Sequence, residues 1–280
     1  MHKAVLQSDA LLFVHTMKST ARAGFLLCCM VLAVCFCFVT RDAAAASRTD
    51  AASAATVGPA NAPSSTLVVE AAFVNFPPYS IVDDNGPVRG PMVDMVENLL
   101  KQAGIRYTIA GYPLNRIKAN IVSGKTGIFV GPRGVNDVLY GPERILINSI
   151  NLYSLKGRAL PKTIEELKGR SLILLSGYGY DGMAARINNP ASKIRVTDAF
   201  THEAAFKMLL AGRADFVLDY QTPGEFALNN IHGLDAVDSR EMARAEFFLV
   251  LNRQVPNAEQ IMQRLMTTYR LMKQSGNTLN

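Results

Sequence analysis

Residues 95–110, MVENLLKQAGIRYTIA, decide how this chain folds. A segment with helical periodicity, whose apolar side chains share one stripe, runs up to Gly104, and a β-rich run follows at once. The same succession recurs in residues 117–130, 165–175 and 206–218. Each repeat predicts a helix that ends at a left-handed glycine and leads into a strand. The four predicted helix-ending residues are Gly104, Gly124, Gly169 and Gly212.

Strands that alternate with single helices favour an α/β fold with mostly parallel sheets, because right-handed helical crossovers connect parallel strands. In such sheets, ligands bind at the carboxyl ends of the strands. The residues of interest therefore follow the predicted strand ends, which are Val74, Ala110, Val130, Ser176 and Leu218.

The first 46 residues have the order of a secretory signal peptide. Lys18 and Arg22 precede an uncharged apolar run at residues 24–39, and small residues up to Ala46 follow it. We expect residues 1–46 to be removed by cleavage after Ala46, with Met17 as an alternative start to Met1. An uncleaved membrane anchor is the alternative, but the run of 16 residues falls short of the roughly 20 that cross a bilayer.

The exported part is expected to begin with a flexible leader, residues 47–66, because this segment has almost no large apolar side chain. The folded body would then be residues 67–280. All four cysteines lie at residues 28–37, and the body has only His202 and His232 as imidazoles. Disulfides, a metal centre and a cysteine nucleophile are therefore not expected in the body.

The net charge of +6 is scattered along the chain, without a cluster of five basic residues in the exported part. Such a distribution does not indicate a nucleic-acid partner, and at most it favours anionic ligands.

Two glycine-rich motifs suggest nucleotide binding but stand in the wrong context. Residues 119–126, ANIVSGKT, satisfy the relaxed phosphate-loop pattern. A phosphate loop needs a strand before it and a helix after it, whereas here a helix ends and a strand begins. Residues 177–182, GYGYDG, follow a predicted strand, but Asn189 and Pro190 cut the next helix short. No cofactor is expected.

Two aromatic rings follow the first predicted strand. In residues 75–79, NFPPY, two prolines would hold Phe76 and Tyr79 rigidly at the carboxyl end of that strand. Rings in this place suit a platform for a ligand. The alternative is that they only cover the core.

Five stretches of the body follow one another in a characteristic order: IVDDNGPVRGPMVDMVENLL, YPLNRIKANIVSGK, IEELKGRSLILLSGYGYDG, EAAFKMLLAGRADFVLDY and MTTYRLMKQSGN. In this order and spacing, the chain resembles the periplasmic solute-binding proteins of ABC importers, of the polar-amino-acid type called family 3. The resemblance covers nearly all of residues 67–280. It implies a type II-like fold of two α/β lobes, each a mostly parallel sheet flanked by helices, with two crossing strands as a hinge. Lobe 1 would be residues 67–153 and 245–280, and lobe 2 residues 154–244, with crossings near Tyr153 and Glu246.

The resemblance also implies site residues. Tyr79 matches the family's ring-stacking aromatic, and Arg116 matches the arginine of its P-x-x-R helix start. Arg133 is the nearest candidate for the guanidinium that grips a ligand carboxylate. Gly179 and Tyr180 would supply backbone N–H groups from lobe 2. Asp219 would receive a ligand ammonium.

The sequence departs from the family pattern at two positions, the arginine that binds a carboxylate and the acid that binds an ammonium. The usual T-P-E-R is absent in register, because Leu139 stands where its arginine would be. The ammonium-binding acid aligns with Asp219 or, one place on, with Tyr220, which makes an α-amino acid ligand doubtful.

Structural alternatives also exist for each polar candidate. Arg116 would lie on a solvated helix face, Arg133 would pair with Asp137, and Asp219 would cap a helix. His202, next to a predicted N-cap at Thr201, is expected at the surface without a role.

The sequence therefore predicts an exported, periplasmic binding protein, without enzymatic activity, that captures a small polar, amino-acid-like or anionic solute. It would act as a monomer and present the solute to a membrane ABC permease. The first alternative is a periplasmic enzyme on the same scaffold, similar to prephenate or arogenate dehydratases, with Asp219 or Asp181 as the acid. The second is a ligand-sensing accessory module that docks to a membrane partner.

Overall fold

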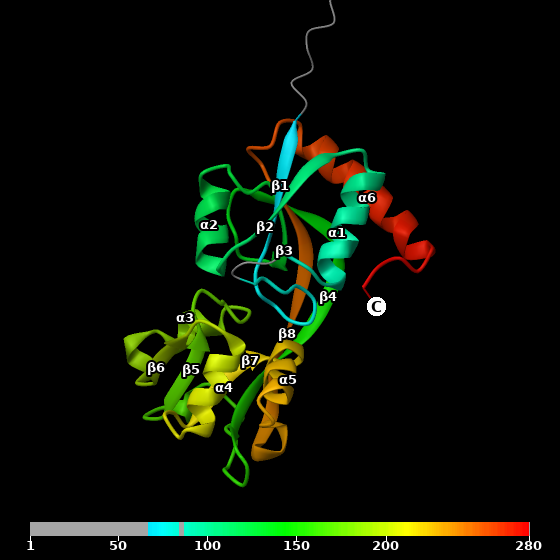
Figure 1. Ribbon diagram of the computed structural model, residues 1–280. Helices are drawn as coiled ribbons and strands as arrows, with labels where there is room; N and C mark the ends of the chain where they lie inside the picture. The colour runs from blue at the N-terminus through cyan, green and yellow to red at the C-terminus, as the bar shows by residue number, and fades with distance from the viewer. Residues whose placement is uncertain (1–66, 84–86, 280) are drawn as a thin grey trace, which may run out of the picture. The chain divides into compact units, whose positions relative to one another are not determined.

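The repeated succession of helix, glycine and strand forms the elements it predicts in the computed structural model, which describes residues 67–83 and 87–279 (Figure 1). The matching helix and strand pairs are α1 (Pro91–Gln102) and β2 (Arg106–Gly111), α2 (Leu114–Val122) and β3 (Ile128–Pro132), and α4 (His202–Leu210) and β7 (Phe216–Tyr220). The four glycines have φ angles of 64°, 76°, 78° and 70° in chain order, so their left-handed conformation is confirmed. The predicted signal peptide and leader lie outside the described residues.

The repeat at residues 165–175 forms less helix than expected. Only a 3₁₀ turn, η1 (Glu165–Leu167), precedes β5 (Ser171–Leu175). Between Pro161 and the left-handed Gly169, residues 162–168 form this one turn and no α-helix. Leu167 still faces the core, with 1% of its surface exposed.

The eight strands form one hydrogen-bonded sheet in the order β2-β1-β3-β8-β4-β7-β5-β6. β1 (Val68–Phe73) is parallel to β2 and β3, and β5 is parallel to β6 (Arg195–Ala199) and β7. Two long antiparallel strands, β4 (Val138–Leu155) and β8 (Val237–Asn252), connect these two groups. The α/β class, with two mostly parallel groups and two crossing strands, is thereby confirmed. The sheet is continuous because β4 and β8 each run through both groups.

A short two-stranded segment lies between the two groups. β3 pairs with β8 from Phe247 onward, and β7 pairs with β4 at residues 150–153. Between these pairings, residues 147–149 of β4 pair only with residues 244–246 of β8. Glu246 falls within this segment, whereas Tyr153 lies inside the pairing with β7. The exact lobe boundaries remain a prediction.

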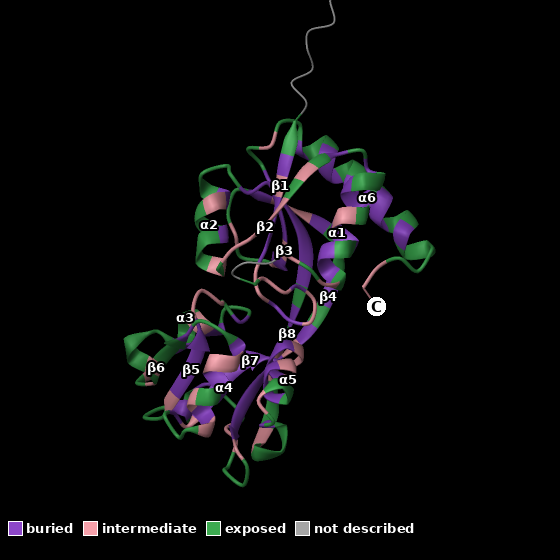
Figure 2. Cartoon of the chain, in the orientation of Figure 1, coloured by how far each residue is buried: buried purple, intermediate pink, exposed green. Residues whose placement is uncertain are grey.

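The core lies between the sheet and the helices that cover it (Figure 2). Met95, Val96, Leu99 and Leu100 of α1 are all at most 4% exposed, which confirms the predicted apolar stripe. The remaining elements are α3 (Met183–Ile187), η2 (Pro190–Ser192), α5 (Gln221–Asn230), η3 (Leu234–Ala236) and α6 (Ala258–Gln274). In the described part of the chain, no helix is both long and apolar enough to span a membrane.

Gly90 fixes the aromatic loop to the start of α1. Its φ is 126°, and a Cβ atom built on it would lie 2.6 Å from the Tyr79 carbonyl oxygen and 3.0 Å from that of Pro78. The Met92 N–H donates to the same Tyr79 oxygen at 2.9 Å. The loop that carries Phe76 and Tyr79 therefore packs backbone against backbone on Gly90.

Gly90→Ala is expected to destabilise the protein by at least about 2 kcal/mol, because it adds backbone strain to a clash with atoms that have little freedom to move. Gly104→Ala is the matched control: its φ is 64° and its Cβ would meet nothing within 4 Å. That control should cost only about 1 kcal/mol. Urea unfolding of both variants measures the difference, and equal costs would contradict this account of the loop.

Candidate functional site

An inner cavity lies at the carboxyl ends of β1, β3, β5 and β7. Its volume is about 50 Å³, and its lining includes Val74, Val130, Tyr178, Gly179 and Tyr220. These residues follow or end four of the predicted strands, and they come from both groups of parallel strands. The cavity therefore lies where the α/β fold is expected to place a ligand.

Phe76 is the centre of an aromatic cluster at this cavity. Its ring centroid lies 5.2 Å from that of Tyr220, 5.4 Å from that of Phe247 and 6.0 Å from that of Tyr79. Phe76 is 2% exposed, whereas Tyr79 is only partly buried. Phe76 thus belongs to the core and also forms a wall of the cavity, so the two alternatives for this ring are not exclusive.

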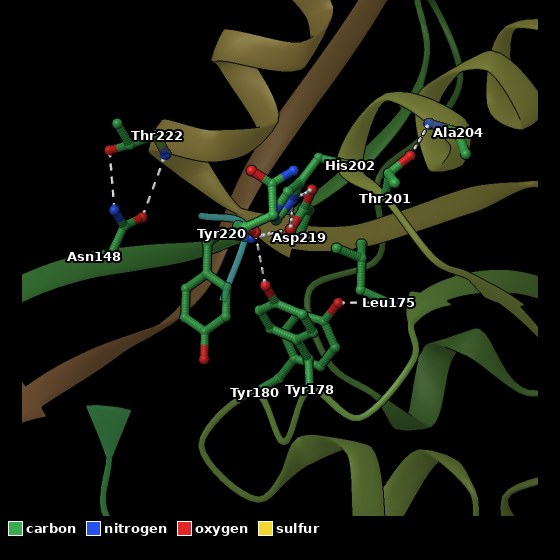
Figure 3. A network of polar contacts seen from close by, with 11 residues as sticks. Asn148, Leu175, Tyr178, Tyr180, Thr201, His202, Ala204, Asp219, Tyr220 and Thr222 are labelled. Atoms are coloured by element: carbon green, nitrogen blue, oxygen red, sulfur yellow. Dashed lines mark hydrogen bonds and ion pairs between the residues drawn. The ribbon is translucent and has the colours of Figure 1, made fainter. Parts of the chain in front are cut away.

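Tyr178 and Tyr220 line the cavity from the side of β5 and β7, and the Tyr180 ring packs beside theirs (Figure 3). The Tyr178 hydroxyl donates to the Asn75 carbonyl oxygen at 3.2 Å, and the Tyr180 hydroxyl accepts from the Leu175 N–H at 2.9 Å. Burial, and then the charge of Asp219, raises the pKa of Tyr178, Tyr180 and Tyr220 above the ordinary tyrosine value. All three therefore remain neutral phenols at physiological pH, able to donate a hydrogen bond but not to carry charge.

His202 and Asp219 form a buried pair behind these rings (Figure 3). The His202 Nδ1 lies 2.7 Å from Asp219 Oδ2 and 3.0 Å from Oδ1, and Oδ1 also accepts from the Tyr220 N–H at 2.8 Å. The two residues are 2% and 0% exposed. The Asp219 carboxylate therefore has hydrogen-bond partners within the protein and does not need a ligand to supply them.

The expectation that His202 lies at the surface is wrong. Thr201 does cap α4 as predicted, because its Oγ1 accepts from the Ala204 N–H at 3.1 Å. His202 is the next residue, and its side chain turns inward to meet Asp219 at the end of β7. Its Nε2 atom is buried without a hydrogen-bond partner among the described residues.

An outer cavity of about 230 Å³ adjoins the inner one and shares Leu114, Ile117, Phe129, Pro132 and Gly179 with it. Lys118 and Arg133 also line this outer cavity.

Both cations of the outer cavity have neighbours in the protein that are not carboxylates. The Lys118 Nζ donates to the Gly177 carbonyl oxygen at 2.6 Å, and burial lowers the pKa of this lysine. The Arg133 guanidinium lies 4.3 Å from the Phe248 ring centroid and 5.1 Å from that of Tyr140. Among the described residues, Arg133 forms no ion pair, so the alternative of a pair with Asp137 is not observed.

The structure gathers some of the predicted site residues and separates others. Phe76 and Gly179 line the inner cavity, and Arg133 and Gly179 line the outer one. Tyr79 borders a broad groove of about 810 Å³ instead, and Arg133 borders this groove as well as the outer cavity.

The other predicted residues do not line the two cavities. Arg116 is exposed on α2, with its guanidinium 5.4 Å from the Tyr112 ring centroid. The Tyr180 side chain packs inside its own group of strands, so only its backbone remains a candidate. Asp219 is fully buried against His202.

Sequence reasoning missed several residues of the cavities, which include Lys118, Tyr178, Tyr220 and Phe247. Tyr178 and Tyr220 follow predicted strand ends and could have been found by that rule. Lys118 lies one helical turn after Leu114, at the end of α2 that faces the site, which is a weaker signal.

Neither nucleotide motif forms a nucleotide site. Gly124–Thr126 lie between the end of α2 and the start of β3, and the Thr126 hydroxyl donates to Glu70 Oε1 at 2.8 Å. GYGYDG leads into α3, which has only five residues. In residues 67–83 and 87–279, no group of three histidine, cysteine, aspartate or glutamate side chains could hold a metal ion.

The chain's sequence matches no known protein family and no curated protein. Its structure is similar to an ancestral arginine-binding protein bound to arginine, with a TM-score of 0.64, 16% identity and coverage of 75% of this chain and 94% of that chain. It is also similar to the substrate-binding protein of an ABC uptake transporter from Streptococcus pneumoniae with bound histidine, with a TM-score of 0.63, 16% identity and coverage of 75% and 88%. A histidine kinase sensor domain with similarity to periplasmic binding proteins has a TM-score of 0.64, 16% identity and coverage of 75% and 91%.

At such low identity, the comparisons establish the fold alone. The chain has the fold of the periplasmic binding proteins, in agreement with the family resemblance of its sequence. Two of these neighbours are binding proteins with a bound amino acid, and the third is a sensor domain.

Proposed function

We propose that this protein is exported to the periplasm, captures a small solute between its two lobes and presents it to the permease of an ABC importer. The observation that carries the proposal is the pair of adjoining cavities at the carboxyl ends of β1, β3, β5 and β7. In α/β proteins such a position is where ligands bind. The ABC uptake role of one structural neighbour supports the importer context.

The two lobes would close on the solute. Lobe 1 would comprise residues 67–153 and 245–280, and lobe 2 residues 154–244. Contacts between them include Tyr178 Oη to the Asn75 carbonyl and Lys118 Nζ to the Gly177 carbonyl. A solute that contacts both sides stabilises the closed arrangement by its differential affinity for it. Binding then changes the surface that a permease contacts.

A thermal-shift screen of the purified protein against amino acids, polyamines, small carboxylates and sugars tests this proposal. A ligand present at 100 times its Kd should add about 2.7 kcal/mol of stability. For a body of this size, that corresponds to a rise in Tm of roughly 5–10 °C. Residues 47–66 are expected not to contribute to the transition.

A blocking variant makes the screen specific for the cavities. A Cβ atom at Gly179 meets nothing within 4 Å, and this glycine lines both cavities, so Gly179→Leu should fold and fill the binding space. Ala211→Leu, at an exposed residue after α4, adds a side chain of equal size away from the cavities. The ligand-induced shift should vanish in the first variant and persist in the second. A shift that survives Gly179→Leu would place the ligand elsewhere.

The sensor-domain neighbour favours a second candidate, a sensory module that passes ligand occupancy to a membrane partner. Affinity capture with the ligand-loaded protein separates the two candidates, because a permease is expected in one case and a sensor kinase in the other. The dehydratase-like alternative requires an available acid in the site. The Asp219 carboxylate contacts His202 instead, and Asp181 is exposed and lines neither cavity.

A further inference from the structure

We infer that the ligand of this site is an anion with an apolar body and no ammonium group. The inference rests on the proposed function and names the chemical class that the two cavities fit. It departs from the amino acids that the structural neighbours bind.

The inner cavity fits an apolar group. None of its lining side chains is charged, and its walls are mainly aromatic and aliphatic, with Phe76, Phe129, Tyr220 and Phe247 among them. Two of its polar side chains already have partners in the protein: Ser80 Oγ donates to the Val74 carbonyl at 2.7 Å, and Tyr178 donates to the Asn75 carbonyl. The third, Tyr220, is a neutral phenol. An apolar group gains from burial here, whereas a charged group would lose its hydration without compensation.

The outer cavity supplies the countercharge for an anion. Its only charged lining residues are Lys118 and Arg133, and both are cations. Lys118 bonds to a backbone carbonyl, and Arg133 stacks on Phe248 without a carboxylate partner among the described residues. A ligand carboxylate at this position would gain charge-assisted hydrogen bonds from one or both groups.

Neither cavity has a carboxylate that could pair with a ligand ammonium. No aspartate or glutamate lines them. Asp219, the residue at the expected place, is 0% exposed, and its two oxygens accept from His202 and from the Tyr220 N–H. The ammonium of an α-amino acid whose carboxylate lies at Lys118 and Arg133 would therefore lie close to two cations and pair with no carboxylate of the protein, which disfavours α-amino acids.

Three matched probes test the ligand class by calorimetric titration: 3-phenylpropanoate, phenylalanine and 3-phenylpropan-1-ol. Phenylalanine adds only the ammonium to the first probe, and the alcohol removes its charge. We expect 3-phenylpropanoate to bind at least about tenfold more tightly than either of the others. Phenylalanine binding as tightly as 3-phenylpropanoate would overturn the inference.

Two variants test the countercharge. Lys118→Met and Arg133→Gln together should weaken 3-phenylpropanoate at least about tenfold and leave the affinity for the alcohol unchanged. Lys168→Met, at an exposed lysine outside both cavities, is the matched control and should change neither. An unchanged affinity for 3-phenylpropanoate in the double variant would overturn the inference.

The failure of the inference can be told apart from the failure of the proposed function. If the three probes do not bind, but the broad screen finds another ligand whose shift Gly179→Leu abolishes, the ligand class is wrong and the binding function stands. If no ligand sensitive to Gly179→Leu is found, both are overturned.

Discussion

His202→Leu is expected to lower the free energy of unfolding by about 3–5 kcal/mol, because it leaves the fully buried Asp219 carboxylate without its side-chain partner. The remaining N–H of Tyr220 compensates only one of the two carboxylate oxygens. For a body of this size, the Tm should fall by about 2–4 °C per kcal/mol. Chemical denaturation monitored by circular dichroism measures the loss.

A second substitution separates the lost partner from the lost side-chain volume. Asp219→Asn added to His202→Leu removes the uncompensated charge and keeps an oxygen that accepts from the Tyr220 N–H, so it should recover at least half of the loss. His232→Asn is the control, because His232 is exposed and its φ of 54° suits asparagine. If His202→Leu costs no more than His232→Asn, the pair does not stabilise the fold.

Phe76→Ala is expected to cost about 3–5 kcal/mol, since it removes the ring at the centre of the aromatic cluster. Tyr220 and Phe247 would lose their central contact, and both already border a cavity that the fold leaves open. Collapse into the vacated space would require two groups of strands to move. Phe200→Ala provides the same chemical change at a ring that is 86% exposed, and it should lie within about 0.5 kcal/mol of the parent protein.

The enlarged cavity of Phe76→Ala gives this prediction a second readout. A small apolar molecule such as toluene should enter the vacated space and raise the Tm of the variant, because it restores contacts with an apolar lining. The parent protein should show a smaller rise in Tm at the same concentration, because the Phe76 ring still fills this part of the space. A large loss of stability without rescue by toluene would mean that the loop rearranges when the ring is removed.

The sequence predicted the architecture well because its signals are local. A stripe of apolar residues, a glycine that takes positive φ and a β-rich run lie within 16 residues of one another, as in residues 95–110. These repeats predict parallel strands. Parallel strands in turn predict that the cavities lie at the carboxyl ends of the strands. The third repeat formed only a 3₁₀ turn before its glycine, although the strand after it is as predicted.

The side chains of the site were harder to predict because their roles depend on contacts between distant residues. His202 and Asp219 are 17 residues apart, and nothing in the sequence near either one indicates that their side chains are in contact. Lys118 lies 59 residues before the carbonyl that it contacts. The place after the first predicted strand drew attention to Phe76, and the family resemblance to Gly179 and Arg133; all three line one of the two cavities. The resemblance did not indicate that Asp219 is occupied by an internal partner.

The direction of β1 has a practical consequence for handling this protein. Val68 begins the strand beside Arg106, and Phe73 ends it at the inner cavity, so about 17 Å of strand separates the chain's entry from the pocket. Anchoring the molecule to a sensor chip through an affinity tag ahead of Leu67 would therefore leave the pocket facing the flowing solution. Surface-based titrations of the proposed solute can use that attachment, since it lies at the opposite end of β1 from the inner cavity.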